Sequence, residues 1–538
     1  MPRVLVVGFD GATLELAQRW QSEDRMPAFA SICADGSYGT LRSTFPYNSA
    51  VAWASLCTGV NPGRHGIFDF VLPRVGEYRL RVATREDRRV PALWSYASDA
   101  GARVGVVNIP MTFPAEAVNG VMVSGMDAPM LDERAVHPSD FVAQLRQMQP
   151  DYRIISNAHR RAADGDFDGA ERELIEAVEA RGAFTAELAR PRDLDLIMVN
   201  LEATDGAQHF FWQHFDPAHP RHDPKASAAW RDTIGRVYQA VDRELGRIVD
   251  AYAPDTVFVV SDHGGGPSND WIVFMNDWLA AEGFLSMRRR RGASVARRAY
   301  GETLSRISVP LKRRLRPLLG GAIERVKGMA LYGDVDWTAS RAFATVQPMV
   351  LLNRAGREPQ GVVADADADR TLDEIAARAD ALRRPDGGRV FDSASRGAQV
   401  YQGDAPGGPD LVVDPVPGLE VKGRNTGVKP GHVLHLRDLG GYSPSGLHTP
   451  VGLVAAAGAG VQRRGHAEES DIHQVAASVL AVMGVPAPTL DAGPFAFVSS
   501  DFRSTGAAPT STSAAGTDFS AEEEEEILDR LRGLGYVD

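Results

Sequence analysis

The stretch VFVVSDHGGG, residues 257–266, joins a continuous apolar run to an acid and an imidazole. Two further apolar runs lead to acidic residues in the same way: Val4-Leu5-Val6-Val7 precedes Asp10, and Leu196-Ile197-Met198-Val199 precedes Asp205. Short apolar runs rich in Val and Ile, bounded by Gly and Asp, are typical of strands buried on both faces of a parallel sheet. Ligands of open α/β sheets gather outside the carboxyl ends of such strands. We therefore predict that these acids converge at one edge of a parallel sheet.

Helical segments alternate with these strands. Residues 168–189 and 233–251 both have helical periodicity, the second with an apolar stripe that includes Val237 and Val241. Alternating strands and helices indicate a mostly parallel sheet covered on both faces. The predicted fold is an α/β protein built as a three-layer α/β/α sandwich, with an inserted cap or subdomain.

Two of the acids have an imidazole close by. Asp205 and His209 are four residues apart and would share one face of a helix, whereas Asp262 and His263 are adjacent. A single Asp at a strand end is more often a turn former or a helix N-cap. Carboxylates and imidazoles together suit Zn²⁺ or Mn²⁺ better than Ca²⁺. Two such ions can clamp the attacking and leaving oxygens of a displacement at phosphorus, so the pattern predicts a two-metal hydrolase.

The nucleophile is suggested by Ser49 in the stretch STFPYNSAVAW, residues 43–53, which is followed by Thr58-Gly59 and by PGRHG at residues 62–66. With these motifs the chain resembles the alkaline phosphatase superfamily, in its type I phosphodiesterase and nucleotide pyrophosphatase branch, from Arg3 to about Pro488. In that branch a Thr or Ser nucleophile lies nine residues before the Thr-Gly pair, which selects Ser49 and not Thr44. The alternative is that Ser49 only caps the following helix.

The resemblance implies a complete set of site residues. One ion would be held by Asp10, Asp262, His263 and the Ser49 oxygen, and the other by Asp205, His209 and His448. Both would be divalent ions, with Zn²⁺ expected and Mn²⁺ as the alternative. Ser49, deprotonated by its metal, would attack phosphorus, and water would then release the phosphoserine intermediate.

One departure from the family pattern concerns Phe70. Nucleotide pyrophosphatases have an Asn shortly after the His-Gly-Ile run that helps to bind a phosphate oxygen, and Phe70 stands at that place here. The departure weakens a nucleotide diester as the substrate and leaves the metal chemistry untouched. We interpret His65 as a structural residue that satisfies local hydrogen bonds, and Cys57 as a packing residue.

Several functions are compatible with these residues. A phosphodiesterase is favoured over a phosphomonoesterase by analogy alone, and a phosphoryl-group transferase is a further alternative. A sulfatase of this superfamily would need a Cys or Ser in a Cys/Ser-x-Pro-x-Arg motif, which the sequence around Ser49 does not supply. A non-catalytic interaction protein on this fold is disfavoured because the full ligand set is present.

Composition and net charge limit the kinds of partner and the cellular location that we expect. The 538 residues are 44% apolar and 24% charged, which is ordinary for a globular protein with a large core and insertions. The net charge of -12 argues against nucleic acid as a partner, so we expect a small anionic phosphoester substrate. Neither a signal peptide nor a membrane-spanning segment is recognisable, which predicts a cytoplasmic location. Cys33 and Cys57 are the only cysteines and allow no disulfide framework.

The predicted organisation has three parts. Residues 1–500 form the catalytic domain, which contains a basic helical insertion at 275–335 and a smaller α/β portion at 337–440. Within the insertion, the basic stretch 288–316 is either a solvated helical face or a cap that attracts an anionic substrate. Residues 501–519 form a flexible linker. Residues 520–538 form a helix whose Ile527, Leu528, Leu531 and Leu534 dock on the body or on a partner subunit, so a homo-oligomer is possible.

Overall fold

The computed structural model describes residues 1–74, 76–191, 193–288, 332, 335–423, 432–439, 442–487, 490–499 and 519–536. Most of the basic insertion, including nearly all of the stretch 288–316, lies outside the described residues, as does most of the expected linker.

A ten-stranded sheet forms the centre of the molecule. Its strand order is β20-β2-β19-β9-β1-β8-β5-β6-β7, with β21 pairing to β2. The strands are β1 (Val4–Gly8), β2 (Ser37–Arg42), β5 (Val104–Ile109), β6 (Gly120–Ser124), β7 (Val136–His137), β8 (Leu196–Asn200), β9 (Thr256–Val260), β19 (Val451–Gly458), β20 (Gly465–His466) and β21 (Ser470–Asp471). The middle of the sheet is parallel, because β1 pairs with β8 on one side and β9 on the other, and Val4 stands opposite both Leu196 and Thr256. The mostly parallel central sheet predicted from the apolar runs is confirmed.

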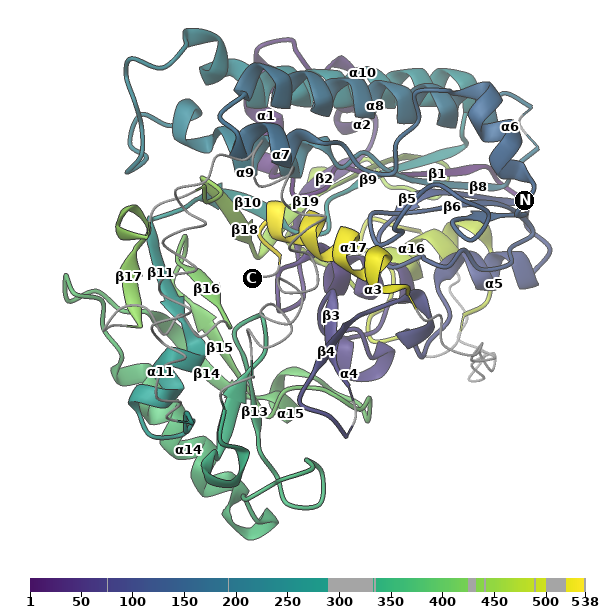
Figure 1. Cartoon of the computed structure of the whole chain (residues 1–538). Helices are drawn as coiled ribbons and strands as arrows, with labels where there is room; N and C mark the ends of the chain where they lie inside the picture. The colour runs from purple at the N-terminus through teal and green to yellow at the C-terminus, as the bar shows by residue number, and fades with distance from the viewer. Residues whose placement is uncertain are drawn as a thin grey trace.

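Helices cover both faces of this sheet (Figure 1). Along β1, Leu5 and Val7 belong to one apolar core, while Val4 and Val6 belong to the other. This alternation is what a strand with two buried faces requires. The first core is covered by α1 (Leu14–Ser22), α2 (Pro27–Asp35), α6 (Phe141–Met148), α7 (Ala158–Ala163), α8 (Phe167–Ala189), α9 (Ala203–Phe215) and α10 (Thr233–Tyr252). The second is covered by α3 (Ser49–Thr58), α5 (Leu93–Asp99) and α16 (Gln474–Met483).

Smaller sheets lie beyond the sandwich. The cap is built from the antiparallel sheet β12-β13-β15-β14 and the helix α14 (Asp365–Ala381), with strands at Ala342–Ala344, Met349–Leu352, Leu411–Pro415 and Phe391–Arg396 in that order. Next to it stands the sheet β16 (Glu420–Lys422), β11 (Trp271–Phe274) and β17 (Val433–His435), together with α11 (Met275–Ala281). Two short helices and one hairpin also lie outside the sandwich. The helices are α4 (Pro62–His65) and α15 (Gly397–Val400), and the hairpin consists of β3 (Val71–Pro73) and β4 (Leu80–Val82).

The C-terminal helix α17 (Ala521–Gly533) packs on the same chain. Ser520 caps its first turn, and the Glu523 carboxylate accepts from the Ser520 N–H in return. Ile527, Leu531 and Leu534 are buried against the body of the molecule. Figure 1 shows α17, in yellow, near the junction of the sandwich and the cap. The apolar residues that were expected to need a docking surface therefore find it within this chain.

None of the helices in the described part of the chain is long and apolar enough to cross a membrane.

Candidate active site

Seven side chains singled out in the sequence meet at the carboxyl edge of the central sheet. They come from five places: Asp10 just beyond β1, Ser49 at the start of α3, Asp205 and His209 in α9 after β8, Asp262 and His263 just beyond β9, and His448 in β18 (Gly446–Thr449). All seven are buried or nearly so. The structure brings all seven together although they are spread over more than 400 positions of the sequence.

The nucleophile candidate lies between the two ligand groups. Ser49 Oγ is 3.2 Å from Asp10 Oδ1 and 3.2 Å from His263 Nε2. On the other side of the site, Asp205 Oδ1 is 3.2 Å from His209 Nε2 and 3.5 Å from His448 Nε2.

Two clusters have ligand atoms close enough to share an ion. The first consists of Asp205, His209 and His448, which is the group expected for one of the two metals. The second consists of Asp10, Asp205 and His263, so Asp205 stands where Asp262 was expected. Asp205 therefore belongs to both groups, and Asp262 lies next to the second group, with Oδ2 3.3 Å from His263 Nε2.

A glycine-rich strand places His448. β10 (Gly264–Pro267) follows His263 directly and pairs antiparallel with β18, with Gly265 opposite His448. The pairing sets the His448 ring 4.1 Å from the His263 ring, measured between centroids. This partnership links two segments far apart in sequence, which is why His448 could be inferred only from the family resemblance.

Backbone carbonyls orient two of the imidazoles. His209 Nδ1 lies 2.7 Å from the Gly446 carbonyl oxygen, and His263 Nδ1 lies 3.0 Å from that of Gly264. A carbonyl can only accept, so each Nδ1 carries a proton, and in the neutral form of each ring Nε2 presents its lone pair to the site. Metal-binding histidines in proteins are held in this way by a partner on the far nitrogen.

Asp10 is held by two residues that sequence reasoning missed. Its Oδ2 accepts from Trp53 Nε1 at 2.9 Å and from Asn200 Nδ2 at 2.8 Å. Trp53 reaches Asp10 because Gly8 has no side chain: a Cβ there would lie 2.3 Å from the indole ring. The remaining oxygen, Oδ1, is thereby directed at Ser49. The only signals in the sequence were the position of Trp53 one helical turn after Ser49 and of Asn200 at the end of an apolar run.

The electrostatics of the site favour a bound cation. Burial and the neighbouring charge of Asp205 raise the pKa of Asp10, and burial and the charge of Asp10 raise the pKa of Asp262 well above its ordinary value. Burial would also raise the pKa of Asp205, but His209 and His448 outweigh it and bring that pKa well below its ordinary value. Burial and His263 lower the pKa of His448 to about 3, which keeps this imidazole neutral and able to act as a ligand.

The donor set therefore fits divalent cations. Among the described residues, no hydrogen-bond donor is directed at the buried atom Asp262 Oδ2. An isolated buried carboxylate is costly, and a cation nearby removes that cost. Three carboxylates with three imidazoles match the ligand preferences of Zn²⁺ and related ions.

Ser49 is the first residue of α3 and not its N-cap. The cap is Asn48, whose side-chain oxygen accepts from the Val51 N–H at 3.1 Å. The alternative that Ser49 serves as the helix cap is therefore wrong. Its hydroxyl is instead directed at Asp10 and His263.

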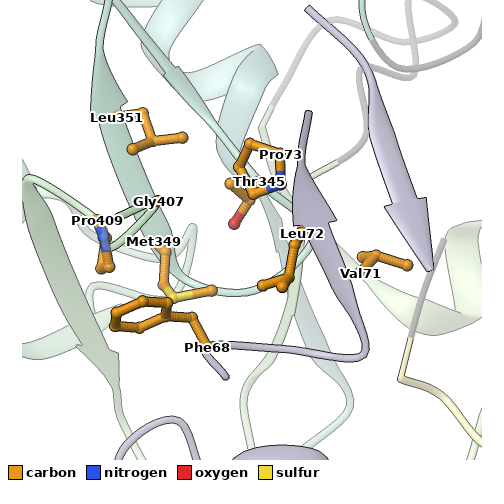
Figure 2. A pocket seen from close by; sticks show the side chains of 9 residues that line it. All are labelled: Phe68, Val71, Leu72, Pro73, Thr345, Met349, Leu351, Gly407 and Pro409. Atoms are coloured by element: carbon orange, nitrogen blue, oxygen red, sulfur yellow. The ribbon is translucent and has the colours of Figure 1, made fainter. Parts of the chain in front are cut away.

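The neighbouring residues lie outside the chemical centre. His65 is fully buried, with Nε2 2.9 Å from Ser55 Oγ and Nδ1 accepting from the Ile67 N–H, which agrees with a structural role. Cys57 is buried in the core. An apolar cleft between β3 and the cap is lined by Phe68, Val71, Leu72, Pro73, Thr345, Met349, Leu351, Gly407 and Pro409 (Figure 2). It contains no charged side chain, so it supplies no chemistry of its own.

An eighth residue, Tyr536, enters the site from the C-terminal segment. Its hydroxyl lies 2.8 Å from Ser49 Oγ and donates to Asp205 Oδ2 at 3.4 Å. Nothing in the sequence indicated this contact, because Tyr536 lies 487 positions from Ser49.

The family model for type I phosphodiesterase / nucleotide pyrophosphatase matches residues 4–441. The chain belongs to this family. Its hydrolase chemistry is directed at phosphoesters, and the Asp and His groups described above are possible metal sites. Comparison with curated protein sequences finds no significant match.

Many solved structures share the fold of this phosphodiesterase family member, among them a murine and a bacterial protein. Murine ectonucleotide pyrophosphatase/phosphodiesterase 5, as an inactive variant in complex with AMP, is 12% identical, with a TM-score of 0.51 over 92% of this chain and 98% of the other. Phosphonoacetate hydrolase from Sinorhizobium meliloti 1021, in complex with phosphonoacetate, is 16% identical, with a TM-score of 0.52 over 88% of this chain and 94% of the other. At these identities the similarity establishes the fold: a central mostly parallel sheet flanked by helices.

Proposed function

We propose that this chain is a two-metal phosphoric ester hydrolase that acts on phosphodiesters through a phosphoserine intermediate at Ser49. The observation that carries the proposal is the position of Ser49 Oγ, 3.2 Å from both Asp10 Oδ1 and His263 Nε2 at the centre of a buried Asp and His cluster. Phosphomonoesters are the alternative substrate class.

The residues that would hold the ions form two sets. Asp10, Asp262, His263 and Ser49 would hold one, with Asp205 beside them, and Asp205, His209 and His448 would hold the other. We expect Zn²⁺, with Mn²⁺ as the alternative. When bound, the two cations would supply positive charge that favours the ionised Ser49 hydroxyl and the oxygens of the transferring phosphoryl group.

The side chains account for the two halves of the reaction. Ser49 Oγ forms a bond to phosphorus while the bond from phosphorus to the leaving alcohol oxygen breaks, and the alcohol departs with a proton. Water then attacks phosphorus and the bond from Ser49 Oγ to phosphorus breaks. The product leaves as a phosphate monoester from a diester, or as inorganic phosphate from a monoester, and the Ser49 hydroxyl is restored. The N–H groups of Ser49 and Ala50, the first two residues of α3, have no partner inside the helix and can donate to the phosphoryl oxygens, whereas that of Val51 donates to Asn48.

A kinetic comparison of Ser49→Ala with Thr44→Ala tests the nucleophile. We expect Ser49→Ala to lower kcat on bis(nitrophenyl) phosphate at least about 10³-fold, because the covalent route is lost. Metal content measured by elemental analysis should change little, because six protein ligands remain. Thr44→Ala should keep the wild-type rate. The reverse pattern would show that the nucleophile is misassigned.

Three further measurements test the rest of the proposal. If the intermediate is covalent, mass spectrometry after acid quenching during turnover should find a phosphoryl group on Ser49, which from a diester still carries its remaining ester group. Rates on nitrophenyl phosphate and on its diester separate the two substrate classes. A chain that retains no transition metal and is not activated by Zn²⁺ or Mn²⁺ would contradict the two-metal mechanism.

A further inference from the structure

Tyr536 occupies the place that a substrate needs. Its hydroxyl is 2.8 Å from Ser49 Oγ, and its side chain is 2% exposed. A phosphorus atom under attack has to lie about 3–3.5 Å from the nucleophile, on the side of Ser49 that faces the other ligands. The phenol stands on that side, because its hydroxyl also reaches Asp205. A phosphoester and the Tyr536 side chain therefore cannot be bound at the same time.

The aromatic ring is enclosed by residues of the site. The Tyr536 ring packs on Phe70 with the ring centroids 4.8 Å apart, and on His448 with the centroids 5.2 Å apart. Two donors from the cap side fix the backbone around it: Gln347 Nε2 donates to the Tyr536 carbonyl at 3.2 Å, and Lys422 Nζ donates to the Gly535 carbonyl at 3.0 Å. The tip of the chain is thus held by contacts to both the sandwich and the cap.

Helix α17 positions Tyr536 three residues beyond its own end. The Arg530 guanidinium is buried and donates to the carbonyl oxygens of Met126, Ala128 and Pro129. Surface ion pairs join Arg160 to Glu526 and Asp529. α17 takes no part in any β-sheet and packs on the outside of the molecule, mainly against α7 and β4. It can therefore leave without breaking a strand pairing of the central sheet.

We propose that Tyr536 is a tethered competitive ligand of the active site, and that the chain turns over substrate only in the conformation in which Tyr536 has left. The inference rests on the proposed function of the Ser49 site. Because the ligand is part of the chain, it is always present at high effective concentration. The apparent substrate affinity is then the intrinsic affinity multiplied by the fraction of molecules in which the site is open.

The kinetic test removes the ring while keeping the rest of the chain. Tyr536→Ala should raise kcat/KM on nitrophenyl phosphoesters at least tenfold, because the competitor is absent. A double variant, Ile527→Asp with Leu531→Asp, should raise it similarly, since buried charges release α17 with the Tyr536 hydroxyl intact. Tyr38→Ala is the matched control: this half-buried ring packs against His466 on the edge strand β20, away from Ser49, and the change should leave kcat/KM at the wild-type value.

The opposite outcomes have clear meanings. A fall in kcat/KM for both Tyr536→Ala and the α17 double variant would show that Tyr536 takes part in the chemistry, and would overturn the inference. An unchanged kcat/KM in both would reduce the contact to a structural one and would overturn it as well.

A binding measurement separates this inference from the proposed function. Phenylphosphonate, which has no ester bond to hydrolyse, is titrated calorimetrically into the metal-loaded wild type and Tyr536→Ala. We expect the dissociation constant to be at least tenfold lower for the variant. If neither the wild type nor any variant hydrolyses an ester but this difference in binding is found, the proposed function is wrong and the proposal that Tyr536 competes for the site is supported. Equal binding, or none to either form, overturns the competitor.

Discussion

At the scale of single residues, the site depends on the different partners of the two oxygens of the Asp10 carboxylate. Asp10 Oδ2 is taken up by Asn200 and Trp53, and this leaves Oδ1 for Ser49 and His263. A carboxylate that is hydrogen-bonded on one oxygen loses rotational freedom, so the other oxygen is preorganised as a ligand. Asn200 and Trp53 are therefore positioning residues in the proposed hydrolase.

Removal of the Asn200 amide should weaken the metal site without unfolding the chain. For Asn200→Ala we expect metal affinity and kcat/KM to fall by about 10- to 100-fold, which is the usual cost of losing such a partner. The measurements are a competitive metal titration and steady-state kinetics. Asn119→Ala is the control, because the Asn119 amide also donates hydrogen bonds, in its case to the Gly101 and Ala102 carbonyls, but lies next to the amino end of β6. Equal effects of both changes would mean that Asn200 acts through stability alone.

The sequence predicted single residues unevenly. Asp10, Asp205, His209, Asp262 and His263 could be selected because each follows an apolar run or has a partner at a helical spacing. Ser49 and His448 needed the family resemblance, since their neighbours in space are distant in sequence. Asn200, Trp53 and Tyr536 could not be found, because hydrogen bonds between distant segments leave no periodic signal. The metal-ligand and nucleophile roles of the seven remain proposals.

At the scale of elements, the helix pair α8 and α10 shows how closely the outer layer packs. Both helices agree with the segments 168–189 and 233–251 that periodicity predicts. Their contact depends on Gly182, where a Cβ would lie 2.6 Å from the Cβ of Glu244. Periodicity could place the helices but could not show that a fully buried acid lies between them. The pairing of β10 with β18 also could not be predicted from the sequence, because a run of glycines has a low strand propensity.

The buried acid Glu244 gives a pH-dependent prediction. Burial raises the pKa of Glu244 to about 7, against the opposing charges of Arg247 and Arg243. The folded pKa lies above the unfolded value of 4.5, so the folded state favours the neutral acid. The resulting stability is complete below about pH 4.5 and is lost as the pH rises through 7. Glu244→Gln, which cannot ionise, should escape this loss.

The measurement is urea unfolding of Glu244→Gln and wild type at two pH values. At pH 8 we expect the variant to have the larger free energy of unfolding by about 1–2 kcal/mol, discounted for screening by Arg247 and solvent. Near pH 4.5 the difference should vanish. Glu187→Gln is the control, since that residue is exposed near the end of α8. A variant that is less stable than wild type at pH 8 would show that the Arg247 pair outweighs the cost of burial.

At the scale of the whole molecule, the sandwich followed from the sequence and the position of the C-terminal segment did not. Apolar runs and helical stripes are local patterns, and they fix the layers because each strand must bury both faces. The position of α17 depends on surfaces formed by other parts of the fold. From the sequence alone, its apolar stripe is equally compatible with packing against a partner subunit. The structure instead buries Ile527 and Leu531 on this chain.

The same scale gives the prediction for metal removal. The proposed ligands come from the ends of β1 and β9 and from α3, α9 and β18. β1 and β9 already pair as strands, and bound cations would tie α3, α9 and β18 more firmly to them. They would also relieve the mutual repulsion that raises the pKa values of Asp10 and Asp262. Zn²⁺ or Mn²⁺ at 100 times the dissociation constant should stabilise the fold by about 2.7 kcal/mol and raise the melting temperature by a few degrees, and a chelator should reverse this.

Asp205→Asn should abolish most of that stabilisation, because Asp205 belongs to both ligand groups. Its melting temperature should therefore respond little to added metal, in differential scanning calorimetry with and without chelator. Asp140→Asn, an exposed residue at the start of α6, should respond as the wild type does. A wild-type melting temperature that is the same with metal and with chelator would mean that this cluster of carboxylates is stable without cations. In that case, bound protons would have to remove the repulsion between Asp10 and Asp262. Because these protons are lost as the pH rises, the melting temperature would fall with rising pH.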